Sequence, residues 1–435
     1  MTQFLKSTWL DILWCIAITA YILAGVQAVP LHGDESTQIY MGRDVYYHLQ
    51  GNTEQVLFRD WELLEGDDST EQQLRLLNGT LPKYLFGAVA YLSAYELEDI
   101  NQQWAWGSGW DWNHQNGHVP SDDLLFRSRL VSASLLAISA IALFYVGYTV
   151  FGRNVAYLAS AYYTLNPAIL VNGRRAMMEG AMLAFTILAI LIALHLLKNR
   201  CWWHYVLLGI ISGLAVASKH TSIITIATIF AVCGVYFLIY HKKHILYLFA
   251  SGMLSLLVFF ALNPAWWIAP LSAPATVLEL RQELLAGQVG FFGGYESINE
   301  QVTGFARQSF VVLPIYADSD FDDFYSAQVE AIETYDSSLL SGVSLGGSII
   351  GAMIVFILVV IGVASLWLYE KIHTAHKWLI TTWFLAMVLL TLILTPLEWQ
   401  RYYLPIYPVI GLLGAIGIEF LLSKVGVWRA ISKKS

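Results

Sequence analysis

Long apolar runs, separated by short polar connections, dominate this sequence. A membrane-spanning helix needs about 20 predominantly apolar residues, and about ten runs reach or approach that length. They lie near residues 8–30, 128–151, 155–171, 176–197, 203–218, 221–240, 245–262, 342–369, 378–395 and 402–422. The third and fifth runs are short. This pattern predicts an all-α integral membrane protein, built as one membrane domain over residues 1–435 without a separate soluble domain.

The first run has two interpretations. Val26-Gln27-Ala28 resembles a signal-peptide cleavage site, which would make the run a removable leader. The run is long, however, and it leads directly into residues that have the character of a functional site. We therefore favour a retained membrane anchor.

The Lys and Arg residues of the short connections set the expected orientation, because cytoplasmic loops carry an excess of both. With a cytoplasmic N-terminus, that side receives Lys6, Arg153, Lys198, Arg200, Lys242, Lys243, Lys371, Lys377, Lys424, Arg429, Lys433 and Lys434. The short outer connections receive only Arg174, Arg175, Lys219 and Arg401. We expect both termini in the cytoplasm of a multi-pass protein of the cell membrane.

Two segments, residues 31–127 and 263–341, are far longer than ordinary connections, and both are expected outside the cytoplasm. Connections of this length usually carry function. Within the first, residues 84–97 are apolar but too few to span, which indicates a helix in the membrane interface. Four tryptophans follow: Trp104, Trp106, Trp110 and Trp112. Their rings either stack on sugars or anchor the segment at the interface, and we favour anchoring.

The composition agrees with a membrane protein. Hydrophobic residues make up 57% of the chain and charged residues 13%, half the roughly 25% of soluble domains. The formal net charge of -8 is spread without a block of like charge, so nothing indicates a nucleic-acid partner. The three cysteines have neither metal-binding nor redox spacing.

The first candidate for chemistry is His32-Gly33-Asp34-Glu35, directly after the first run. Two adjacent carboxylates at a membrane surface fit a general base with a supporting acid. The alternative is the solvated start of a helix, with Asp34 as its N-cap and Glu35 in its first turn. Spacing alone favours the alternative.

A second candidate lies near the outer end of the fourth run. Arg175 and Glu179 are four residues apart and would share one helix face. Ionisable groups at such depth are costly and usually functional. A self-satisfied ion pair, with the arginine extended toward the surface, explains the pattern equally well.

Cations in the outer connections point to an anion. Lys219 and Arg401 each lie in a very short outer turn, against the general trend, and Arg174 and Arg175 lie in another. Phosphate is a usual partner of such residues. Anionic lipid headgroups are the alternative. Lys83, at the start of the interfacial stretch, adds little by itself.

Taken in order, these pieces resemble the GT-C superfamily of polyprenyl-phosphate-dependent glycosyltransferases, in the branch of the protein O-mannosyltransferases and lipid A aminoarabinose transferases. The matching residues are His32 to Glu35, Pro82-Lys83, Arg174 to Glu179, Gly213 through Ser222, Asn263-Pro264 with Trp266, and Arg401 to Pro405 with Pro408. Two features depart from the family. The His-Pro-Pro-Leu-Gly-Lys run of the O-mannosyltransferases is reduced to Leu81-Pro82-Lys83, and the sugar-recognition repeats of eukaryotic relatives are missing. The resemblance therefore does not identify the acceptor.

The resemblance implies a GT-C-type bundle of about ten transmembrane helices, with a long first extracytoplasmic loop that carries juxtamembrane helices. It also implies inverting transfer of a sugar from a polyprenyl- or dolichyl-phosphate carrier to an acceptor hydroxyl. Asp34 corresponds to the catalytic carboxylate, with Glu35 beside it. The donor phosphate is expected at Lys83, Arg174, Arg175, Lys219 and Arg401, supported by Glu179, His220 and Tyr402.

The implied reaction requires no cofactor, since the leaving group is already a phosphate monoester. Related oligosaccharyl transferases use a divalent ion, which keeps a metal at Asp34 and Glu35 open. The expected partners are the lipid-linked donor, a hydroxyl acceptor on protein, lipid or glycan, and membrane lipids. Two alternatives stand beside protein glycosylation. One is a lipid or sugar transporter or flippase, which would carry charges near the bilayer midplane. The other is an enzyme that modifies lipids or cell-envelope glycans.

Overall fold

The computed structural model describes residues 2–61, 64, 67–317 and 322–425, and all regular structure within them is helical. The α-helices are α1 (Thr2–Ala24), α2 (Gly33–Met41), α3 (Arg43–Leu49), α4 (Asp67–Leu77), α5 (Thr80–Leu92), α6 (Trp110–Gln115), α7 (Asp122–Val150), α8 (Arg153–Leu165), α9 (Pro167–Arg174), α10 (Glu179–Asn199), α11 (Trp202–Ser218), α12 (Ile223–Tyr240), α13 (Ile245–Leu262), α14 (Ala273–Phe292), α15 (Ile298–Ala306), α16 (Asp322–Asp336), α17 (Ile349–Leu368), α18 (Thr374–Ile393) and α19 (Tyr407–Val425). Shorter 3-10 or π turns are η1 (Thr53–Val56), η3 (Leu97–Asp99), η4 (His220–Ser222), η5 (Lys242–His244), η6 (Pro264–Trp266), η7 (Arg307–Val311), η8 (Gln400–Tyr402) and η9 (Leu404–Ile406).

Seven helical segments in the described residues are long and apolar enough to cross a membrane: Asp122–Val150, Glu179–Asn199, His220–Tyr240, Lys242–Leu262, Ile349–Leu368, Thr374–Ile393 and Gln400–Lys424. Two further apolar helices, Thr8–Ala24 and Trp202–Ser218, are shorter. The structure thus confirms an all-helical, multi-pass membrane protein, while a total of about ten spans, counted at about 20 residues each, stays a prediction.

The predicted run at 155–171 is not one continuous helix. It is divided between α8 and α9 at Asn166-Pro167. Pro167 has no amide hydrogen with which to continue α8. The side-chain oxygen of Asn166 accepts a hydrogen bond from the Ile169 amide at 3.2 Å and caps the new helix. Local chemistry therefore divides a run that hydropathy alone treats as a single segment.

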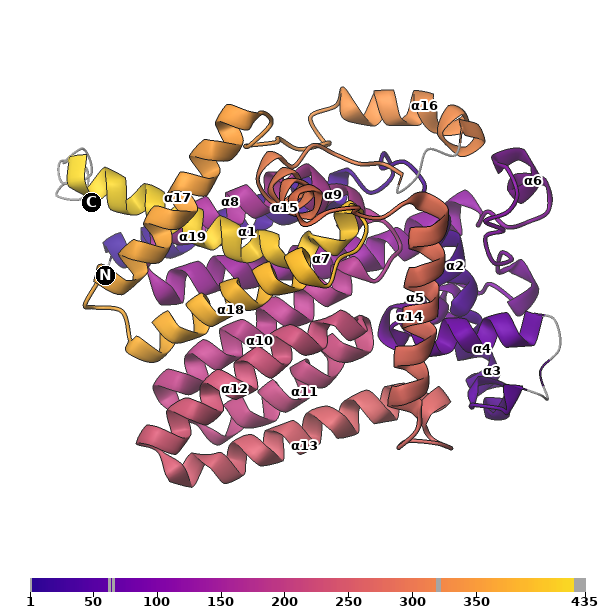
Figure 1. The fold of residues 1–435 in the computed structure, drawn as a ribbon, viewed down its shortest axis with the longest axis horizontal. Helices are drawn as coiled ribbons and strands as arrows, with labels where there is room; N and C mark the ends of the chain where they lie inside the picture. Colours follow the sequence, from indigo (N-terminus) through magenta and orange to yellow (C-terminus); the bar gives the residue numbers. More distant parts are fainter. Residues whose placement is uncertain (1, 62–63, 65–66, 318–321, 426–435) are drawn as a thin grey trace.

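The spanning helices form one bundle (Figure 1). Helix α10 lies inside it, packed against α7, α11 and α12. Helices α13 and α17 lie at its edges, against α11 and α19, and most of their apolar length stays exposed. Exposed Leu256, Leu257, Ile350 and Phe356 are of the kind that lipid chains would cover.

Helix α1 begins and α19 ends at the same end of this bundle (Figure 1). Polar contacts of α8 tie them together there, since Arg153 donates to Asp11 at 2.8 Å and Asn154 donates to Glu419 at 3.3 Å. Four residues of the orientation argument lie outside the described side chains: Lys6, Arg429, Lys433 and Lys434.

The opposite end carries α2 to α6 from the first long segment and α14 from the second (Figure 1). The predicted interfacial stretch is found in α5, which packs against α2, α3 and α7. Gly42 and Gly87 make this packing close, because the carbonyl group of Gly42 leaves no space for a Cβ on Gly87. The first long segment is therefore a folded layer on the bundle, and it fixes the position of α2.

Candidate active site

Helix α2 begins directly after α1, and its start is held by a reciprocal cap. The amide of Asp34 donates to Nδ1 of His32 at 3.1 Å, and the amide of His32 donates to Oε2 of Glu35 at 3.1 Å. His32, not Asp34, is the N-cap, so both carboxylates lie in the first turn. The predicted helix start is confirmed, but the cap assigned to Asp34 is wrong, because His32 supplies the accepting atom.

The two adjacent carboxylates have different surroundings. The side chain of Glu35 is 0% exposed. It accepts hydrogen bonds from Nε and Nη2 of Arg129, at 2.7 and 2.8 Å, and from the Ala176 amide at 2.8 Å. Burial alone would raise the pKa of Glu35, but the charge and hydrogen bonds of Arg129, the charge of Arg175 and the Ala176 amide hold that pKa below its ordinary value. Glu35 therefore acts as an ionised structural link between α2, α7 and the chain just before α10.

Asp34 is the more accessible carboxylate, with 25% of its side chain exposed. Its Oδ2 accepts a hydrogen bond from Nη1 of Arg401, which comes from the far end of the sequence. The guanidinium of Arg401 lies 5.0 Å from the ring centroid of Trp399 and 5.8 Å from that of Tyr402. Cation–π contacts of this kind hold a guanidinium in one place. The structure thus brings together the predicted carboxylate, the predicted cation Arg401 and the predicted supporting residue Tyr402.

The turn that presents Arg401 is fixed by the second long segment. Gln400 donates to the Leu313 carbonyl at 2.6 Å and accepts from the Ile315 amide at 3.2 Å. Glu398 accepts hydrogen bonds from Arg307 and from Gln308. Arg401 therefore projects from a turn whose neighbouring residues are held on both sides.

Lys219 and Glu179 form a second ion pair. Nζ of Lys219 lies 2.7 Å from Oε1 of Glu179, and both side chains are buried. The predicted shared helix face of Arg175 and Glu179 is wrong, because α10 begins only at Glu179 and the backbone at Arg175 is extended. Two buried atoms beside this pair, Oε2 of Glu179 and Nε2 of His220, have no hydrogen-bond partner within the described residues.

Arg174 and Arg175 are buried and bind the protein itself. Arg174 donates to the carbonyl oxygens of Tyr21 and Ile22, both at 2.8 Å, and to the Tyr335 hydroxyl at 2.7 Å. Arg175 donates to the carbonyl oxygens of Pro30 and Tyr316 at 3.1 and 2.7 Å. In this arrangement they connect the end of α1 with the second long segment.

Lys83 lies in a separate buried group of charges. Its Nζ is 2.7 Å from Oδ2 of Asp44, and Arg75 reaches both Asp44 and Glu71. Burial would raise the pKa of Asp44, but the charges of Lys83 and Arg75 lower it below its ordinary value. Lys83 therefore stabilises the layer of α3, α4 and α5 in this structure.

The sequence analysis missed Arg129, Asp44 and Arg75. The signal for Arg129 is its position at the start of the apolar run 128–151, where a buried cation needs a counter-charge. Asp44 and Arg75 give no comparable signal, because charged residues are ordinary in a polar segment.

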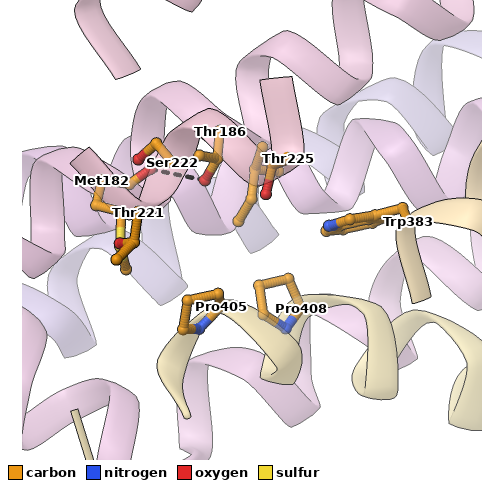
Figure 2. Close-up of a pocket in the computed structure, with 9 residues that line it drawn as sticks. Met182, Thr186, Thr221, Ser222, Thr225, Trp383, Pro405 and Pro408 are labelled. Carbon is orange, nitrogen blue, oxygen red and sulfur yellow. Dashed lines mark hydrogen bonds between the residues drawn. The ribbon is translucent and has the colours of Figure 1, made fainter. Parts of the chain in front are cut away.

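A small pocket lies between helices α10, α12, α18 and α19 (Figure 2). Its lining residues come from α10, η4, α12, α18, η9 and α19: Met182, Thr186, Ile187, Thr221, Ser222, Thr225, Trp383, Pro405 and Pro408. Figure 2 shows Pro405 and Pro408 facing the hydroxyl-bearing side chains. Thr221 and Pro405, which follow Lys219 and Arg401 by two and four positions, both line this pocket.

Glu35 is not available as a metal ligand in this structure. Both oxygens of Glu35 already accept hydrogen bonds from Arg129, and its neighbours add two more. Nowhere in the described part of the chain do three His, Cys, Asp or Glu side chains gather as a potential metal-binding group.

Comparison with known proteins places these residues in a wider context. Residues 121–268 match the dolichyl-phosphate-mannose-protein mannosyltransferase family. They include Arg129, Arg174, Arg175, Glu179 and Lys219. A search of curated proteins found no match to the chain.

Two solved structures share the fold. ArnT from Cupriavidus metallidurans, bound to undecaprenyl phosphate, is 11% identical with a TM-score of 0.52, and the match covers 95% of this chain and 60% of that protein. The oligosaccharyltransferase of Archaeoglobus fulgidus in its apo form is 13% identical with a TM-score of 0.56, and the match covers 98% of this chain and 52% of that protein. The chain thus spans little more than half the length of the proteins that it resembles. The resemblance predicted from the sequence is confirmed in these terms: residues 121–268 match the dolichyl-phosphate-mannose-protein mannosyltransferase family, and the chain shares the membrane fold of ArnT and of the oligosaccharyltransferase.

Proposed function

We propose that this protein transfers a sugar from a polyprenyl-phosphate carrier to an acceptor hydroxyl on the extracytoplasmic face of the membrane, with inversion at the anomeric carbon. The observation that carries the proposal is the contact between Asp34 and Arg401. It joins a partly exposed carboxylate and a fixed cation from opposite ends of the sequence. A base for the attacking hydroxyl and a cation for the departing phosphate are the two groups that such a transfer uses.

In the proposed reaction, the carboxylate of Asp34 accepts the proton of the acceptor hydroxyl while that oxygen attacks the anomeric carbon of the sugar. The bond between that carbon and the phosphate oxygen breaks, and the lipid phosphate leaves with the electron pair. Asp34 ends the step as a carboxylic acid and returns its proton to water. Attack from the face opposite the phosphate inverts the anomeric configuration.

Arg401 is proposed to stabilise the charge that develops on the phosphate. A guanidinium carries five N–H donors in a planar fork, so one edge can bind Asp34 while another binds phosphate oxygens. Because the phosphate becomes more negative as the bond breaks, part of this contribution exists only in the transition state.

Lys219 is proposed as the second phosphate ligand, because residues that closely follow Lys219 and Arg401 in the sequence, Thr221 and Pro405, line one pocket. An ammonium has three donors, and Glu179 takes one of them. Glu179 holds this lysine in place, and His220 directly follows it in the sequence. Glu35, Lys83, Arg174 and Arg175 are proposed to hold the surrounding helices, since each binds protein groups in the structure.

The nature of the donor is supported by the comparisons. The family that matches residues 121–268 is named for dolichyl-phosphate-mannose, and the ArnT structure was solved with undecaprenyl phosphate. We therefore propose a polyprenyl-phosphate sugar as donor, with mannose as the first sugar to test. The proposed step requires no metal, because the leaving group already carries a phosphate.

Asp34→Asn is expected to fold, bind undecaprenyl phosphate and lose about 10²–10⁴-fold in transfer rate, because general-base catalysis is typically worth that much. Purified protein in nanodiscs, polyprenyl-phosphate mannose and a panel of hydroxyl acceptors provide the assay. Asp60→Asn, an exposed carboxylate of the same segment outside the tryptophan-bearing loop, is the control and should transfer normally. Near-normal transfer by Asp34→Asn would remove this residue from the mechanism.

Arg401→Lys is expected to impair transfer markedly although the charge is kept, because lysine lacks the planar fork that binds two partners at once. Lys219→Ala should lose both donor affinity and turnover. Donor binding and single-turnover rates in one nanodisc lipid measure both effects. If these cations only anchor lipid headgroups, Arg401→Lys will be nearly silent and Lys219→Ala will change stability without changing donor binding.

Glu35→Gln is expected to lower stability by about 3–5 kcal/mol, because it leaves Arg129 buried without its counter-charge. Thermal unfolding in detergent, followed by intrinsic fluorescence, measures the change against Asp34→Asn, which should unfold near the wild-type temperature. The folded pKa of Glu35 lies below its ordinary value, so its contribution is full above the ordinary pKa and disappears as the pH falls through the folded pKa. The stability of Glu35→Gln should therefore fall less steeply in acid, and unaltered stability at neutral pH would refute the structural role.

The proposed orientation is tested by labelling intact cells with a membrane-impermeant maleimide. In a Cys201→Ser background, which removes the exposed native thiol, Asn116→Cys should react and Lys243→Cys should react only after permeabilisation. The reverse pattern would place Asp34 on the cytoplasmic side and contradict the proposal.

A further inference from the structure

We infer that the exposed indole of Trp106 is a stacking surface for an uncharged sugar ring of the acceptor, next to the catalytic carboxylate. This inference rests on the proposed function and deepens it, because it assigns the acceptor to the saccharides.

The loop of residues 101–118 is held in one shape. The Gln102 amide donates to the Gly117 carbonyl at 2.8 Å and closes it. The buried side chain of Asn113 donates to three loop carbonyls, at 3.0 to 3.2 Å. Asn101 donates to the Ser36 carbonyl of α2 at 2.9 Å and ties the loop to the helix that carries Asp34. Such a loop presents its exposed rings in a fixed orientation, which lowers the entropic cost of binding.

The tryptophans of the loop have different tasks. Trp104 is 4% exposed and packs on Gly33, where an added Cβ would lie 2.9 Å from the indole. Trp106 is 48% exposed, with its ring centroid 6.3 Å from Trp104 and 6.2 Å from His32. Since His32 accepts the Asp34 amide, only one side chain separates the exposed ring from the residue that bears the catalytic carboxylate. Trp104 is thus the support, and Trp106 is the surface offered to a ligand.

The charges of the loop and of the chain on either side of it indicate the class of ligand. No Lys or Arg occurs between Lys83 and Arg127 in the sequence. Exposed carboxylates are numerous there: Glu96, Glu98, Asp99, Asp111, Asp122 and Asp123. The exposed residues of the loop besides its rings are mainly amides, a histidine and an aspartate.

An interfacial anchor has a different composition, with aliphatic neighbours for the acyl chains and basic residues for anionic headgroups. The surroundings of Trp106 therefore favour a sugar ligand, whereas the sequence alone favoured anchoring of these tryptophans in the membrane interface. A polar loop with one exposed carboxylate and no cation of its own fits an uncharged sugar, whose C–H face packs on an indole and whose hydroxyls bond to the polar side chains of the loop. Anionic glycans would be repelled by the carboxylates.

The loop contains its own matched control. Trp112 is 46% exposed, almost the same as Trp106, but its ring packs on His118 at 4.9 Å and not on His32. Anchoring in the membrane predicts similar effects of replacing either ring. An acceptor subsite beside Asp34 predicts an effect at Trp106 alone.

The experiment uses full-length protein in nanodiscs and measures the binding of mannobiose, a neutral saccharide, by saturation-transfer NMR titration. Trp106→Ala should bind mannobiose at least about tenfold more weakly, as expected when a central aromatic contact is lost. Trp106→Phe should recover part of the affinity, and Trp112→Ala should bind as the wild type does. In the transfer assay, Trp106→Ala should raise KM for a mannoside acceptor and leave the affinity for undecaprenyl phosphate unchanged.

Three outcomes would overturn the inference. The first is an equal loss of mannobiose binding in Trp106→Ala and Trp112→Ala. The second is that lipids brominated in their acyl chains quench the tryptophan fluorescence of the wild type more than that of Trp106→Phe, which would place this ring in the membrane. The third is wild-type transfer to a serine-containing peptide with an unchanged acceptor KM in Trp106→Ala. In the last case the transferase assignment would stand and only the saccharide subsite would fail. Wild-type protein that binds no undecaprenyl phosphate and transfers no sugar would refute the proposed function itself.

Discussion

The arrangement of the site depends on the hydrogen bonds that the carboxylate of Glu35 accepts. Nε and Nη2 of Arg129 from α7 donate two of them, the Ala176 amide just before α10 donates a third, and the amide of His32 at the start of α2 donates the fourth. A buried charge is tolerated only when it is paired and fully hydrogen-bonded, and these four contacts meet that condition. They fix α2 against the bundle in one orientation and one register.

The fixed position of Glu35 also determines where the neighbouring Asp34 lies. Because Glu35 points inward, Asp34 occupies the next position around the first turn, keeps contact with solvent and meets Arg401. Arg401 is in turn held by two aromatic rings and by a turn bonded to residues 313–315. One carboxylate thus serves the architecture while its neighbour stays available for chemistry. Arg174 and Arg175 likewise bind backbone carbonyls, whereas Lys219 pairs with the carboxylate of Glu179.

The sequence predicted the features that depend on local order along the chain. The apolar runs predicted the helices, and the departures from the positive-inside trend identified Lys219 and Arg401. The sequence could not predict which charged side chains pair with each other. Glu179 lies four residues from Arg175 yet pairs with Lys219, because the backbone at Arg175 is extended and α10 starts later. The burial of Trp104 beside the exposure of Trp106 likewise depends on Gly33 from another segment. Such contacts arise from tertiary packing, which spacing along one chain does not encode.

The central claim is that Asp34 and Arg401 act together on one transfer event. A double-mutant cycle of single-turnover sugar transfer from polyprenyl-phosphate mannose tests it directly, with wild type, Asp34→Asn, Arg401→Lys and the double variant in the same nanodiscs. Residues that act on one transition state and touch each other give losses that do not multiply. The account predicts that the double variant is scarcely slower than the slower single variant. Losses that multiply in full would show that the two residues act independently and would contradict it.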